Sequence, residues 1–156
     1  MVFRVNFFNN IPLIHQLEGM RMSNFKLVPE LYCDDIEATK KFYVDVFGFS
    51  IEYERLEEGF VYFTLDDVDI MVESANREGR RWITGKMEKP YGRGVNFQWD
   101  VSEIDELYSR VNTFAPESIY LEMETKEYQC GDEVYVQKQF IAQDLDGYLF
   151  RFCCEG

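Results

Sequence analysis

The pattern of hydrophobic and polar positions becomes regular after about residue 26. Residues 26–33 (KLVPELYC) predict a strand, and residues 36–46 predict a helix because their apolar side chains recur at helical spacing. Asp34 or Asp35 is placed to cap the start of this helix, and Gly48 supplies its stop. Three short strands are expected next, at residues 49–56, 59–65 and 68–74, and residues 59–65 alternate in polarity.

The same order of elements then recurs. A loop rich in Gly, Arg and Lys spans residues 76–93, and residues 94–101 (GVNFQWDV) predict the next strand. Ser102 is placed to cap a second helix over residues 103–112. Three further strands are expected at residues 119–125, 133–142 and 148–154.

The two halves of this pattern are copies of one unit. The first helix begins at Ile36 and the second at Ile104, an offset of 68 residues. A βαβββ unit cannot close its own sheet, so two copies predict an α+β fold of two modules whose curved mixed sheets surround a cleft. We expect one domain over residues 23–156, built from repeats at about 26–75 and 94–154. Residues 1–22 are interpreted as an N-terminal extension that packs on a neighbouring subunit or stays loose.

Composition narrows the possible partners. The formal net charge is −13, with 29 acidic residues against 16 basic ones, which argues against nucleic acid as a partner. The charge indicates either a solvated acidic surface or a field that attracts a cationic ligand. Aromatic residues make up 17% of the chain, enough for an aromatic core and for some rings lining a cavity.

The cysteines and the N-terminus bear on the cellular compartment. Cys33, Cys130, Cys153 and Cys154 do not make a zinc-ligand spacing, and the adjacent pair cannot point the same way in a strand. The N-terminus has no long apolar run, so neither a signal peptide nor a membrane span is expected. We therefore expect a cytoplasmic protein with reduced thiols and no membrane partner.

Four stretches together resemble the vicinal oxygen chelate superfamily, the glyoxalase, bleomycin-resistance and dioxygenase group, and more narrowly its bleomycin-resistance-like members. The resemblance rests on the order and spacing of these stretches, which cover most of the chain from Lys26 to Phe152. It implies paired βαβββ modules around a cleft, usually in a homodimer. The resembling stretches are residues 27–49, 58–73, 80–111 and 131–152.

The resemblance also bears on metal binding, because metal-dependent members use four ligands that are mostly His and Glu. The positions that it assigns to those ligands hold Val28, Val72 (or its neighbour Glu73), Asn96 and Arg151. Valine has no donor atom, and a guanidinium cannot be deprotonated to act as a ligand. His15, the single histidine, lies outside the repeat. We therefore expect neither the usual metal nor another cofactor.

Strand alternation identifies which neighbours share the cleft with these positions. Arg151 needs a partner, for which Glu30 and Gln139 are the candidates. It is expected either to form an ion pair with Glu30 or to contact a ligand directly. Trp82 and Tyr91 lie in the long loop and are better stacking candidates than Trp99. Trp99 is one residue away from the cleft-facing positions of its strand, so it is expected in the core. The predicted ligand-binding residues are Glu30, Phe60, Tyr62, Trp82, Tyr91, Asn96, Gln98, Gln139 and Arg151.

These observations favour binding over catalysis. The resemblance implies a protein that sequesters a small cationic antibiotic of the bleomycin type and so confers antibiotic resistance, with acidic charge steering the ligand and aromatic rings holding it. One alternative is a lyase or dioxygenase with an unconventional site, in which carboxylates bind a metal or act as general base. The carboxylates considered for this role are Glu30, Glu73, Glu122 and Glu124, the last two expected on one face of a strand. Another alternative is a binder of an unrelated metabolite.

Overall fold

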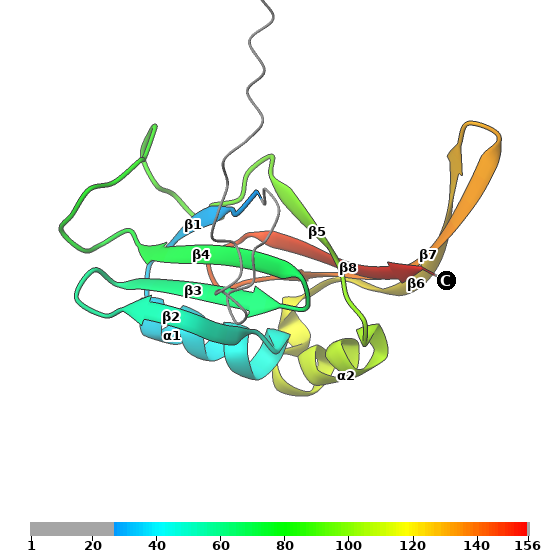
Figure 1. Cartoon of the computed structure of the whole chain (residues 1–156), viewed down its shortest axis with the longest axis horizontal. Coiled ribbons are helices and arrows are strands. Elements are labelled where there is room, and N and C mark those ends of the chain that lie inside the picture. Colours follow the sequence, from blue (N-terminus) through cyan, green and yellow to red (C-terminus); the bar gives the residue numbers. More distant parts are fainter. Residues whose placement is uncertain (1–26, 156) are drawn as a thin grey trace, which may run out of the picture.

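The computed structural model describes residues 27–155, which form two four-stranded mixed sheets with an α-helix each. Both helices lie on the same side of the two sheets (Figure 1). This confirms the predicted α+β class with two βαβββ modules. The predicted N-terminal extension, residues 1–22, lies outside the described residues. Within 27–155, no helix is long and apolar enough to cross a membrane.

The first module has the strand order β1-β4-β3-β2, with β1 parallel to β4 and the other pairs antiparallel. α1 continues directly into a π-helical turn, η1. The elements are β1 (Glu30–Cys33), α1 (Ile36–Phe42), η1 (Tyr43–Phe47), β2 (Ser50–Arg55), β3 (Phe60–Leu65) and β4 (Val68–Ser74).

Local chemistry explains the ends of these elements. Of the two candidate caps, Asp35 is the one that accepts hydrogen bonds from the backbone N–H groups of Glu37 and Ala38, at 3.0 and 3.1 Å. Gly48 ends the helix in the left-handed conformation (φ 81°), as predicted. β1 begins four residues later than predicted, since Pro29 has no N–H to donate to a ladder.

The second module repeats the topology in the order β5-β8-β7-β6, with β5 parallel to β8. The β6–β7 hairpin is longer than predicted at its turn and rises away from the rest of the sheet (Figure 1). The elements are β5 (Asn96–Asp100), α2 (Ile104–Phe114), η2 (Pro116–Ser118), β6 (Ile119–Cys130), β7 (Glu133–Gln143) and β8 (Leu149–Glu155).

The predicted cap of the second helix is wrong. Glu103 occupies the cap position, and its side chain makes no capping hydrogen bond. Ser102 instead donates to the Asp66 carboxylate from its backbone N–H (2.9 Å) and from its hydroxyl (3.3 Å). The hydroxyl cannot accept from the helix while it is turned toward Asp66, which lies in the β3–β4 turn of the other module.

The two modules share one core beneath their sheets. Phe47, from the end of the first helix, packs against Phe150 and Phe152 of β8 with ring centroids 5.4 and 5.3 Å apart. Phe49 contacts Trp99 of β5 at 4.9 Å, so Trp99 is a core residue as predicted. Aromatic side chains from both halves therefore fix how the two sheets sit relative to each other.

Candidate ligand-binding site

The face of the second sheet away from α2 carries a small hollow. Along β5, Phe97 and Trp99 pack into the core, so the alternate residues Asn96 and Gln98 point to the opposite face. Gln98 lies directly across from Arg151 in the parallel β5–β8 ladder. The hollow has a volume of about 170 Å³ and is lined by Asn96, Phe97, Gln98, Ile141, Leu149 and Arg151.

Arg151 is not paired as predicted. Its guanidinium donates a hydrogen bond to the side-chain oxygen of Gln98, whereas Glu30 lies in the other sheet. Gln139 is only 4% exposed and is occupied within its own hairpin. It donates to Glu124 at 2.7 Å and accepts from the Tyr128 hydroxyl at 3.0 Å. The structure therefore brings Asn96, Gln98 and Arg151 together and leaves Gln139 beneath the surface.

Phe60 and Tyr62 lie on the corresponding face of the first sheet, because Val61 and Phe63 alternate with them into the core. The Arg55 guanidinium lies over the Phe60 ring, 3.7 Å from its centroid. Tyr62 stacks on Tyr53 at 5.2 Å and donates to Asp69. Sequence reasoning missed Tyr53, which is exposed. The short turn between the predicted strands 49–56 and 59–65 was the available signal, because a hairpin across it places Tyr53 opposite Tyr62.

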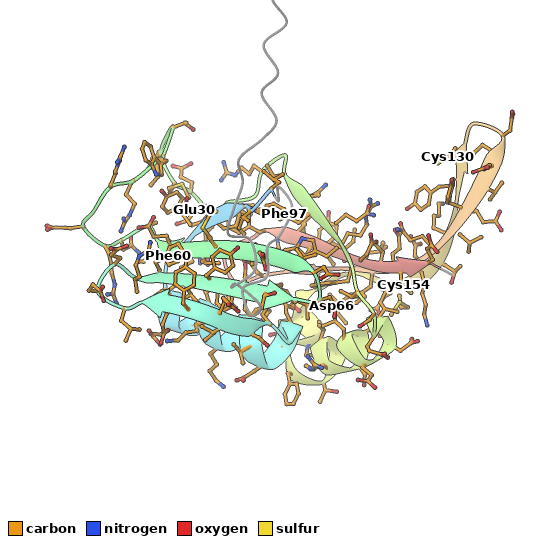
Figure 2. All side chains as sticks on the ribbon, in the orientation of Figure 1. Glu30, Phe60, Asp66, Phe97, Cys130 and Cys154 are labelled. Atoms are coloured by element: carbon orange, nitrogen blue, oxygen red, sulfur yellow. The ribbon has the colours of Figure 1, made fainter. Side chains whose placement is uncertain are left out.

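Glu30 also lies on this face (Figure 2), beside a second carboxylate on β4. Val72, the position assigned to a metal ligand, is 1% exposed and packs in the core. Its neighbour Glu73 is therefore turned to the opposite face, where Arg81 donates to it at 2.6 Å. Burial raises the pKa of Glu73, and nearby Glu30 raises it further, while Arg81 opposes the shift.

The two aromatic candidates of the long loop differ in their surroundings. Trp82 is 64% exposed, with the Arg80 guanidinium 4.3 Å from its ring centroid. Tyr91 donates a hydrogen bond to Asp34 and packs edge-on against Tyr148. That hydrogen bond, together with desolvation, raises the pKa of Tyr91 to about 12. Trp82 is thus open to a ligand, whereas Tyr91 fastens the loop to the fold.

A larger cavity adjoins the hollow at Gln98. We call it the acidic groove; its volume is about 1080 Å³, and it is lined by Asp66, Asp67, Val68, Gln98, Asp100, Val101, Ser102, Tyr128, Cys130, Tyr135, Val136, Gln137, Cys154 and Glu155. Asp66, in the β3–β4 turn, and Cys154 of β8 line it from different modules (Figure 2). Four of these described residues are carboxylates and none is Lys or Arg. Sequence reasoning missed the groove because its walls come from four separate segments.

A family model described as the glyoxalase/bleomycin resistance protein/dioxygenase superfamily matches residues 26–152. The chain belongs to this superfamily. A superfamily member from Vibrio splendidus 12B01 is 52% identical, with 82% of this chain and 97% of that chain covered and a TM-score of 0.40.

Two more distant solved structures share the fold. TioX from Micromonospora sp. ML1 is 20% identical, with 85% of this chain and all of that chain covered and a TM-score of 0.61. FosX from Listeria monocytogenes, a fosfomycin resistance protein, is 17% identical, with coverages of 86% and 94% and a TM-score of 0.52. A comparison with curated proteins gave no match.

Two of the positions that the resemblance assigns to metal ligands hold side chains that do not suit a metal ion. Val72 is buried in the core, and Arg151 brings a positive charge to the site. Across residues 27–155, no group of three or more His, Cys, Asp and Glu side chains could hold a metal ion.

The predicted pairing of Glu122 with Glu124 on one strand face is wrong. The register of β6 against β7 shifts between Leu121 and Glu124, and such a bulge turns one residue to the opposite face. Glu122 accepts a hydrogen bond from Tyr108 of α2, on the helix side. Glu124 pairs with Gln139 on the other side. These two carboxylates therefore do not form a joint site.

Proposed function

We propose that this superfamily member binds and sequesters a small cationic antibiotic of the bleomycin type without turning it over. The observation that carries the proposal is the acidic groove beside the Arg151–Gln98 pair. Carboxylates facing one open volume lower the energy of a cation there, and the chain's net charge of −13 steers cations toward it. Arg151 brings a positive charge to a position that the resemblance assigns to a metal ligand, which supports binding without a metal.

Aromatic rings around the groove supply the second part of the recognition. Tyr128 and Tyr135 line the groove itself, and Trp82 is exposed in the long loop. Rings of this kind hold flat or cationic groups by stacking and by attraction to the ring face, each worth about 0.5–2 kcal/mol. A ligand with a charged end and a flat aromatic end matches both parts.

We further propose that the functional unit is a homodimer, as the resemblance implies. The rising β6–β7 hairpin exposes Val134, Tyr135 and Val136. A cluster of this kind on a protruding arm supports association with a second copy, which would cover it.

The test is a titration of metal-free protein with metal-free bleomycin. Trp82 serves as an exposed fluorescence reporter and buried Trp99 as an internal reference, with calorimetry giving the stoichiometry. We expect saturation below about 1 µM, equivalent to about −8 kcal/mol, at one ligand per chain. Absence of binding up to about 1 mM would contradict sequestration of this antibiotic class and favour an unrelated metabolite.

A pair of matched variants tests the acidic groove as the binding site. Asp67→Asn with Glu155→Gln removes two carboxylate charges from its wall and is expected to weaken bleomycin binding about tenfold, a loss of about 1.4 kcal/mol. The control is Asp45→Asn with Glu37→Gln, which removes two charges from α1 and η1, outside the groove lining. Equal weakening in both variants would show that only the overall charge matters.

One observation favours a second candidate, an enzyme of the lyase type that uses a carboxylate as general base. Glu73 is 7% exposed, its pKa is raised, and it lies beside Glu30. A carboxylate of this kind is a better base at neutral pH than an exposed one. Deuterium exchange into carbonyl compounds, followed by NMR in D₂O, would reveal such activity. The enzyme reading requires that Glu73→Gln abolish the exchange.

A further inference from the structure

The hollow beside β8 has one charged side chain in its lining, that of Arg151. Within residues 27–155, no ion pair includes this arginine. Its guanidinium donates one hydrogen bond to the side-chain oxygen of Gln98, which is a neutral partner. A guanidinium has five N–H donors, so most of them remain for a ligand. A half-buried cation with a neutral partner is best satisfied by an anion.

The fold holds the Arg151 guanidinium in place. β8 lies between β5 and β7, and the residues on either side of Arg151, Phe150 and Phe152, are fully buried in the core. Gln98 lies directly opposite in the β5–β8 ladder and accepts from the guanidinium, which leaves its own NH₂ group as a further donor. Asn96 adds a second amide to the same lining. A fixed guanidinium fork matches the two oxygens of a carboxylate.

The other walls of the hollow are apolar. They come from Phe97, Ile141 and Leu149, and the enclosed volume is about 170 Å³. Carbon atoms attached to a carboxylate leave water when they pack on such walls, and an inorganic anion has none to offer. The combination therefore favours an organic acid over phosphate or sulfate.

We infer that this hollow is a carboxylate subsite. The two oxygens of an organic acid accept from the Arg151 guanidinium, the amides of Asn96 and Gln98 donate from the side, and the carbon part of the acid packs on the apolar walls. Binding at this subsite is non-covalent and requires no proton transfer, because both partners are already charged at neutral pH.

The strand beside the hollow adds a second requirement for the ligand. Asp100 lies two residues after Gln98 on the same face of β5, and it lines the acidic groove but not the hollow. At about 3.3 Å per residue, the two positions are about 7 Å apart. A ligand whose cationic group lies about 7 Å from its carboxylate reaches both, which narrows the ligand class from cations to zwitterions. This extension rests on the proposed function, whereas the carboxylate subsite does not.

The test is calorimetric titration of full-length, metal-free protein with benzoate, with its neutral isostere benzamide and with inorganic phosphate. The net charge of −13 repels anions in general, so an anion that binds must meet a local site. We expect benzoate to saturate with a dissociation constant on the order of 1 mM, and the other two probes to bind at least about fivefold more weakly. No saturation by benzoate up to about 20 mM would overturn the inference, as would equal binding of benzamide or phosphate.

Two substitutions of Arg151 locate the bound benzoate. Arg151→Gln should weaken its binding at least tenfold (about 1.4 kcal/mol or more), and Arg151→Lys should weaken it about threefold because the charge stays while the planar fork is lost. The control is Lys86→Gln, which removes the same charge from an exposed side chain outside the hollow and should leave the affinity within about twofold. Unchanged affinity in Arg151→Gln would overturn the inference. The benzamide comparison uses the unaltered chain, so it decides the matter even if an Arg151 variant does not fold.

A zwitterionic probe tests the extension to the acidic groove. 4-(Aminomethyl)benzoate carries an ammonium group about 7 Å from its carboxylate, the span between the levels of Gln98 and Asp100. It should bind about tenfold more tightly than benzoate, and Asp100→Asn should remove this gain while leaving benzoate itself unaffected. Equal affinity for the two probes would overturn the extension and leave the carboxylate subsite standing. Failure of bleomycin binding would not alter the benzoate results, so the subsite and the proposed function fail separately.

Discussion

Asp144 shows how one buried side chain organises a turn. Its Oδ1 accepts hydrogen bonds from the backbone N–H groups of Asp146, Gly147 and Tyr148, at 3.0, 2.8 and 2.8 Å. Its Oδ2 accepts from the Tyr43 hydroxyl at 2.8 Å, which ties the turn to η1. Burial raises the pKa of Asp144 to about 6, even though these hydrogen bonds favour the charged form.

The raised pKa of Asp144 predicts a pH dependence of stability. Because the folded pKa (about 6) exceeds the unfolded value (about 3.9), stability from this group is fully present below about pH 4 and is lost as the pH rises through 6. Asp144→Asn should remove this contribution. When the pH is lowered from 7 to 4, the free energy of unfolding of the unaltered protein should therefore rise by about 2–3 kcal/mol relative to that of the variant. Urea unfolding at several pH values measures this difference. Parallel stability curves for the two proteins would contradict it.

The starts of the two helices follow different rules. Sequence reasoning assigned a capping side chain to each, yet only Asp35 caps, at α1. Ser102 carries the right hydroxyl at the right spacing but donates it to Asp66 of the other module. A cap prediction considers only the local chain, and a partner from a distant turn competes for the same hydroxyl.

This difference predicts unequal effects of removing the two side chains. Asp35→Ala should lower the free energy of unfolding by about 1 kcal/mol, because two N–H groups at the start of α1 lose their acceptor. Ser102→Ala should cost less than about 0.5 kcal/mol, since it removes one weak exposed hydrogen bond. Urea denaturation of both variants at one pH gives the comparison. A loss at Ser102 as large as that at Asp35 would mean that Ser102 does cap α2.

At the scale of the whole molecule, the shared aromatic core predicts that the modules unfold together. Rings from both halves meet at Phe47, Phe150 and Phe152 and again at Phe49 and Trp99, so neither half keeps its core when the other unfolds. In a Trp82→Phe variant, fluorescence reports only Trp99, while far-UV circular dichroism reports both modules. The two denaturation curves should coincide. Separate transitions would show that the halves are independent.

The sequence by itself determined the order of the elements, their repetition at an offset of 68 residues and the side chains that share a strand face. Alternation along β5 correctly separated Asn96 and Gln98 from core Trp99, because a strand has a period of two wherever its ladder is regular. Only the tertiary structure decided which faces meet. It set Arg151 against Gln98, turned Glu122 away from Glu124 at a bulge and assembled the acidic groove from two modules. These outcomes depend on sheet packing, a register shift and a bent hairpin, which local periodicity does not encode.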